Sequence, residues 1–131
     1  MTEGRTAMFR SYHAAHLTLR IALAIVFLWF GADKFIGPEY WLNAWVPQGV
    51  VEAIARVGMS GRDLVFLNGL FEILVAVSLV SGYFIRIFAS AAILFLLIVT
   101  SMHGFNEVLV RDIGLAGGLL ALAVWPDRTG W

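Results

Sequence analysis

Four stretches of the chain are long and apolar enough to cross a membrane as helices. About 20 mostly apolar residues are needed to cover the roughly 30 Å of hydrocarbon in a bilayer. The stretches cover about residues 17–35, 64–84, 85–102 and 108–125. None of them alternates apolar and polar residues as a membrane strand does, and backbone groups in lipid must find partners within the chain. The pattern therefore predicts four transmembrane helices.

The links between these stretches predict how the helices are arranged. Residues near Ser81-Gly82 join the second helix to the third, and residues 104–106 join the third to the fourth. Links this short make antiparallel neighbours. The sequence therefore predicts an all-α fold: a single membrane domain of residues 1–131, built as an integral membrane four-helix bundle with up-down-up-down topology.

The long connection, residues 36–62, is expected on the side opposite the termini. It contains Trp41 and Trp45, whose rings prefer the headgroup level of a bilayer. Residues 50–57 mix apolar side chains with Glu52 and Arg56. This mixture favours a short amphipathic helix lying on the membrane interface between the first two spans.

The composition supports a membrane protein and excludes several other classes. The chain is 60% hydrophobic and 14% charged, whereas soluble domains have about 45–50% apolar and about 25% charged residues. The lipid bilayer is therefore the main expected partner. A net charge of zero without a basic run gives no nucleic-acid signal. The absence of cysteine excludes disulfides and cysteine-bound iron–sulfur clusters within this chain.

Charge counts give a weak orientation signal. Of the nine Lys and Arg residues, five fall on the predicted terminal side and four on the opposite side. Because positive charge is enriched in cytoplasmic loops, this difference favours cytoplasmic termini. His13 and His16 belong to the polar segment before the first predicted span, where we expect them to be solvated.

The polar residues of the predicted helices converge in the half of the membrane away from the termini. Glu72 follows Asp63 by about 13 Å along the second helix, at 1.5 Å per residue, and so lies near mid-membrane. A carboxylate there costs about 2.5–3.5 kcal/mol to insert. Glu72 is therefore expected to face the bundle interior and to be paired or protonated. Arg111 and Lys34 are the two alternative partners.

Ionisable residues inside a membrane are functional candidates by default. We assign proton-transferring, catalytic roles to Glu72 and His103. We expect no metal site, because His103 and Glu107 could share a metal only if a helix continued through Gly104. The expected ligand-binding residues are Lys34, Asn68, Arg111 and Asp112.

Each candidate also has a structural interpretation, which for His103 is a position at the membrane interface. Asn68 and Glu72 are four residues apart on one helix face and would make an interhelical polar clamp. Arg111 and Asp112 would form an ion pair at the start of a helix. The Lys34 side chain would extend its ammonium group to the interface at the end of the first helix.

Four short motifs occur in a characteristic order. Residues 27–35 read Phe-Leu-Trp-Phe-Gly-Ala-Asp-Lys-Phe, and residues 68–75 read Asn-Gly-Leu-Phe-Glu-Ile-Leu-Val. Residues 82–86 read Gly-Tyr-Phe-Ile-Arg, and Arg-Asp at 111–112 opens a Gly-rich run. In their order and spacing, residues 17–125 resemble the DoxX family of small bacterial and archaeal membrane proteins.

The resemblance implies a four-helix bundle in a bacterial or archaeal plasma membrane. Some DoxX-like proteins are linked to quinone-dependent thiosulfate oxidation, and others to oxidative-stress defence beside partner enzymes. The expected function is a quinone- or redox-linked membrane subunit, at most part of a membrane oxidoreductase, with a quinone as its ligand. Arg111, Lys34 or His103 would donate hydrogen bonds to the quinone oxygens, and Glu72 would relay protons.

Electrons would have to come from a partner, because the chain has no cysteine and no Gly-rich phosphate loop. A partner protein or a homo-oligomer is therefore expected. The alternative is a non-enzymatic membrane scaffold or chaperone that docks a partner protein through residues 36–62. In that case the polar cluster would only hold the bundle together.

Overall fold

The computed structural model describes residues 2–103 and 106–126, and the side chains of all of these except 2, 3, 9 and 103. Within these residues every regular element is a helix, which confirms the all-α prediction. Six helices are present among these residues, where four transmembrane helices and one short interfacial helix were predicted. In chain order they are α1 (Thr2–Ile36), α2 (Pro38–Trp45), α3 (Gln48–Ala55), α4 (Gly61–Ser81), α5 (Ile85–His103) and α6 (Glu107–Ala123).

Three of the described helices are long and apolar enough to cross a membrane. They comprise 33 residues of α1 from Gly4 to Ile36, all 21 residues of α4, and 18 residues of α5 from Ile85 to Met102. Helix α6 has 17 residues and extends over about 25 Å at 1.5 Å per residue. It is therefore slightly shorter than α4 and α5 and about half as long as α1.

The ends of α4 follow from local chemistry. Ser60 precedes the helix, and its hydroxyl accepts a hydrogen bond from the Asp63 backbone N–H at 3.1 Å. The Asp63 carboxylate accepts in return from the Ser60 backbone N–H at 3.1 Å, which completes a capping box. The helix stops at Ser81 because Gly82 adopts a left-handed conformation, with φ of 85°. The predicted tight link at this point is present.

Helix α1 begins well before the predicted first span, which started at residue 17. Its N-terminal half lies beside the end of α6, where the Trp125 ring is 4.9 Å from the His16 ring and 5.3 Å from the Tyr12 ring, between centroids. His16 is only 9% exposed. The prediction that His16 is solvated was wrong, because Trp125 covers it.

Two short helices fill the connection between α1 and α4. Helix α3 overlaps the predicted amphipathic stretch at residues 50–57 and begins directly after Pro47. Helix α2 was not predicted, although it begins at Pro38. Proline suits the first turn of a helix, since no hydrogen bond is lost where its missing N–H would lie.

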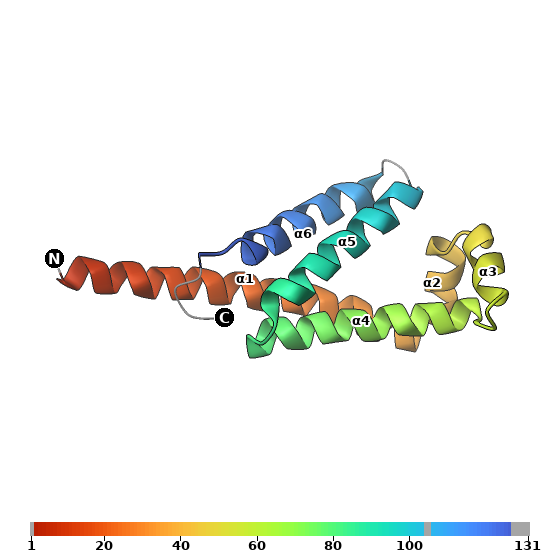
Figure 1. The fold of residues 1–131 in the computed structure, drawn as a ribbon, viewed down its shortest axis with the longest axis horizontal. Coiled ribbons are helices and arrows are strands. Elements are labelled where there is room, and N and C mark those ends of the chain that lie inside the picture. The colour runs from red at the N-terminus through yellow and green to blue at the C-terminus, as the bar shows by residue number, and fades with distance from the viewer. Residues whose placement is uncertain (1, 104–105, 127–131) are drawn as a thin grey trace.

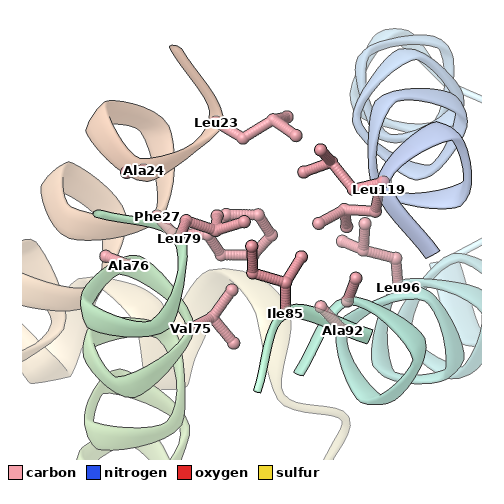
Figure 2. Packing of buried hydrophobic residues seen from close by; sticks show 12 residues of the cluster. Leu23, Ala24, Phe27, Val75, Ala76, Leu79, Ile85, Ala92, Leu96 and Leu119 are labelled. Atoms are coloured by element: carbon pink, nitrogen blue, oxygen red, sulfur yellow. The ribbon is translucent and has the colours of Figure 1, made fainter. Parts of the chain in front are cut away.

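The four longer helices form two pairs. Helix α1 lies along α4, and α5 lies along α6. The two pairs approach each other near the start of α5 and separate toward α2 and α3 (Figure 1). Where they meet, buried apolar side chains from all four helices form one core (Figure 2). Its fully buried large members are Val75, Leu79, Ile85, Leu119 and Leu122.

Two glycines let α1 and α4 touch. A Cβ atom placed on Gly31 would lie 2.9 Å from the carbonyl oxygen of Gly69, and a Cβ on Gly69 would lie 2.9 Å from the carbonyl oxygen of Gly31. Real Cβ atoms do not approach other atoms this closely, so the two helices could not lie at this distance with a side chain at either position. In membranes, where lipid is as apolar as leucine, close packing of this kind is a main source of helix association.

Removal of the cap of α6 is expected to loosen the start of that helix. The Asn106 side-chain oxygen accepts hydrogen bonds from the backbone N–H groups of Val108 and Leu109, at 2.9 and 3.0 Å. We expect Asn106→Ala to lower the free energy of unfolding by about 1 kcal/mol. This free energy is measured by unfolding the protein in detergent while circular dichroism monitors the helix content. Asn43→Ala, at an exposed position within α2, is the control, and an equal loss there would contradict the prediction.

Candidate functional site

Glu72 is paired with Lys34. The Lys34 ammonium donates hydrogen bonds to both carboxylate oxygens of Glu72, each at 3.0 Å. The Lys34 and Glu72 side chains are only 6% and 8% exposed. Of the two partners that the sequence left open, Lys34 therefore holds this carboxylate. Such a pair neutralises two charges that would be costly to bury separately.

The glycine contact between α1 and α4 makes room for this pair. A Cβ on Gly69 would lie 3.1 Å from the Cβ of Lys34, and a Cβ on Gly31 would lie 3.2 Å from the Cβ of Glu72. Each glycine thus faces the charged residue of the other helix. The same close approach that packs the backbones brings the ammonium and carboxylate groups into contact.

Trp41 of α2 lies against the same ion pair. Its ring centroid is 4.0 Å from the Lys34 nitrogen, which is a cation–π contact. Its indole N–H donates to the Asp33 carboxylate at 2.9 Å. Both contacts come from the last turn of α1, so this turn fixes the position and the orientation of the indole ring.

A second ion pair comes from α6. The Arg111 guanidinium donates two hydrogen bonds to the same carboxylate oxygen of its neighbour Asp112, at 3.1 and 3.2 Å. The Asp112 side chain is 4% exposed, whereas that of Arg111 is 45% exposed. The guanidinium carbon also lies 4.8 Å from the ring centroid of Phe30 on α1. Arg111 therefore connects α6 to α1 without holding Glu72.

Both ion pairs border one cavity of about 240 Å³ between the two helix pairs. Most of its lining is apolar, and its polar residues are Lys34, Asn68, Glu72, Arg111 and Asp112. The oxygen of the Asn68 side chain is fully buried and has no hydrogen-bond partner within the described part of the chain. Apolar walls with a few convergent polar groups are the usual composition of a small-molecule site.

The structure thus gathers five of the six residues that the sequence proposed for the site. The sixth, His103, is the last residue of α5, and its side chain lies outside the described residues. The structure gives the positions of these residues. Their catalytic and ligand-binding roles stay predictions.

Sequence reasoning missed the aromatic wall of the cavity. Trp41 and Trp45 were interpreted as interface anchors, yet both line the cavity together with Pro47. The available signal was Pro38, which marks the start of a helix that carries both tryptophans at a spacing of four residues. Residues four apart lie on one face of a helix.

Comparison with known proteins agrees with this architecture. The sequence model of the DoxX family matches residues 15–105, which is more than half of the chain. Neither a comparison with curated proteins nor one with solved structures gave a match.

Proposed function

This chain belongs to the DoxX family and is a multi-pass membrane protein, and on this premise we propose that it is a quinone-linked membrane subunit that acts with a partner enzyme. The observation that carries the proposal is the cavity between the helix pairs, which has apolar walls and two ion pairs at its border, one fully buried and one with a half-exposed arginine. A quinone supplies two-electron, two-proton redox chemistry when it is bound. Electrons come from the partner, since the chain has no cysteine for an iron–sulfur cluster.

The cavity has a suitable size and lining for a quinone head group. An apolar cavity of about 150 Å³ in a protein core is known to hold benzene. A volume of about 240 Å³ therefore suits a substituted six-membered ring. The isoprenoid tail of a quinone would have to leave the cavity toward lipid, between the separating helix pairs.

The residues at the border can orient such a ring and exchange protons with it. Glu72 is the acid–base group, and Lys34 holds its carboxylate in one orientation through two hydrogen bonds. Arg111 uses only part of its five N–H donors on Asp112, so it can also donate to an oxygen of the ligand. Trp41 forms a flat wall that excludes water from the ion pair.

The proposal includes a membrane topology. Helix α6 is the fourth span, with its short apolar part extended by Arg111 and Asp112 at the cavity, and the four longer helices form an up-down-up-down bundle. The bundle lies in a bacterial or archaeal plasma membrane with cytoplasmic termini. The partner enzyme docks at α2 and α3, beside the ligand, or a second copy of the chain does so.

The test is the identity of the lipids that co-purify with the protein in mild detergent. We expect quinone in roughly stoichiometric amount with the native chain and at least about tenfold less with Arg111→Ala, a loss equivalent to about 1.4 kcal/mol. The double variant Lys34→Met with Glu72→Gln removes both buried charges together and is expected to lose quinone as well. Arg62→Ala, at an exposed residue outside the cavity, is the control.

Two outcomes would count against the proposal. Absence of quinone, with no change of melting temperature on adding decylubiquinone, would contradict it. A stoichiometric protein partner that stays bound to the native chain and to these variants, in the absence of quinone, would instead favour the scaffold function. One observation supports that second candidate: Lys34 and Glu72 satisfy each other, as expected for groups that only hold helices together.

A further inference from the structure

The cavity between the helix pairs is covered at both of its ends. Toward α2 and α3 it is covered by Trp41, Trp45 and Pro47. At the opposite end, Phe27 and Leu96 line the cavity and also belong to the buried core. Two routes toward lipid remain between the described helices, one between α1 and α6 and the other between α4 and α5.

The gap between α1 and α6 is bridged by side chains. The Arg111 guanidinium carbon lies 4.8 Å from the centroid of the Phe30 ring, and both residues line the cavity. Nearer the core, the Leu23 side chain of α1 lies against Gly118 of α6, where a Cβ would be in van der Waals contact at 3.4 Å. A ligand that passed here would have to break the cation–π contact of a charged group.

The gap between α4 and α5 widens beyond one aromatic contact. The ring centroids of Phe71 and Phe95 lie 5.7 Å apart, and both residues pack against the core. From there the two helices separate toward α2 and α3 (Figure 1). Ile98 and Met102 follow Phe95 by three and seven residues, so they lie on the same flank of α5. Leu64 precedes Phe71 by seven residues and lies on the matching flank of α4.

Three apolar side chains belong both to the cavity and to the outer surface of the chain. Ile98 and Met102 line the cavity, yet they are 51% and 43% exposed. Leu64 also lines the cavity and is partly exposed. Ile98 and Met102 belong to the part of α5 that is able to span a membrane, so their exposed surface faces hydrocarbon. Leu64, Ile98 and Met102 thus form the rim of an opening, which we call the α4–α5 rim.

We propose that the ligand of this cavity carries a long hydrocarbon chain, and that this chain passes between α4 and α5, across the α4–α5 rim, into the bilayer. An apolar chain crosses such a rim without leaving a polar group unpaired, whereas a polar or charged ligand would lose its hydration there. The ring stays beside the two ion pairs. The inference rests on the proposed function and adds the route of the ligand and the residues that select a quinone with a chain.

Photolabelling locates the chain of the ligand. The probe is a decylubiquinone analogue with a photoreactive diazirine in its alkyl chain. It is bound to the purified protein in detergent and illuminated, and the labelled peptides are mapped by mass spectrometry. We expect label at Leu64, Ile98 and Met102, and we expect excess decylubiquinone to suppress it. Suppressible label at Phe30 and along α6 instead would overturn the inference, because the chain would then pass between α1 and α6.

Bulky side chains at the rim test the same route by affinity. We expect Ile98→Trp and Met102→Trp each to weaken the binding of decylubiquinone by at least about tenfold, because overpacking obstructs the path of the chain. Binding of dimethoxy-methyl-benzoquinone, the same ring without a chain, should change by no more than about twofold, as for a substitution away from the binding groups. The rise in melting temperature with increasing ligand concentration gives both affinities.

Leu97→Trp is the matched control. Leu97 also lies on α5 and is 57% exposed, but it does not line the cavity, so this variant should bind both quinones as the native protein does. Rim variants that bind decylubiquinone like the native protein, or that bind both quinones equally weakly, would overturn the inference and leave the proposed function standing. If the native chain binds neither quinone, the proposed function fails and the inference fails with it.

Discussion

Lys34→Met is expected to lower the free energy of unfolding by about 3–5 kcal/mol, because removal of one partner from a buried ion pair leaves the other charge uncompensated. Lys34 and Glu72 are almost fully buried and share two hydrogen bonds of 3.0 Å. Methionine has a similar length and keeps the apolar part of the lysine side chain. The loss therefore measures the charge itself. Unfolding by titration with a denaturing detergent gives the free energy.

Two controls separate this effect from a general effect of lysine or arginine removal. The pair of Arg62 with Glu39 is short, at 2.8 Å, but its side chains are 57% and 61% exposed. Arg62→Met should therefore cost no more than about 1 kcal/mol. Adding Glu72→Gln to Lys34→Met should recover part of the loss, because no unpaired charge then remains. Equal losses in Lys34→Met and Arg62→Met would contradict the prediction.

Gly69→Ala is the second substitution with a large expected effect. The new methyl group would lie 2.9 Å from the carbonyl oxygen of Gly31 and 3.1 Å from the Cβ of Lys34. Neither atom belongs to the flexible end of a side chain, so α1 and α4 must separate. We expect a loss of about 1–3 kcal/mol from overpacking. We also expect weaker ligand uptake, because the separation moves Lys34 away from Glu72. The unfolding titration and the quinone extraction measure the two effects.

Gly114→Ala is the matched control for this substitution. Gly114 lies within α6, and a Cβ placed there meets no atom within 4 Å, apart from its own helical turn and neighbours. Alanine has a higher helix propensity than glycine by about 1 kcal/mol. Gly114→Ala should therefore leave stability unchanged or raise it. A loss similar to that of Gly69→Ala would mean that the cost comes from the exchange of glycine and not from the helix contact.

The positions of the long helices were predictable, because hydrocarbon imposes a length and an apolar composition on any segment that crosses it. The cores of the predicted segments coincide with α1, α4, α5 and α6, and the link at Gly82 was located correctly. The start of α1 was not predictable from hydropathy. In its first half, Tyr12 and His16 contact Trp125, a residue far away in the sequence.

The partner of Glu72 was not decided by the sequence, since it depends on the rotation of each helix about its axis. Apolar residues surround a membrane helix on all sides, so their pattern gives little information about rotation. Here the contact between Gly31 and Gly69 sets the rotation of α1 and α4 and selects Lys34 over Arg111. A pair of glycines near charged residues on neighbouring helices was the signal for this arrangement.

The last turn of α1 connects the indole ring of Trp41 to the ion pair of Lys34 and Glu72. Asp33 holds the indole N–H, and the next residue, Lys34, divides its positive charge between the indole ring and Glu72. When Glu72 gains a proton, the attraction between Lys34 and Glu72 weakens, and the ammonium group depends more on the ring. In the proposed function, a proton taken up or released by the Glu72 carboxylate would therefore change how firmly Trp41 and α2 are held, and a partner protein docked at α2 would meet that change.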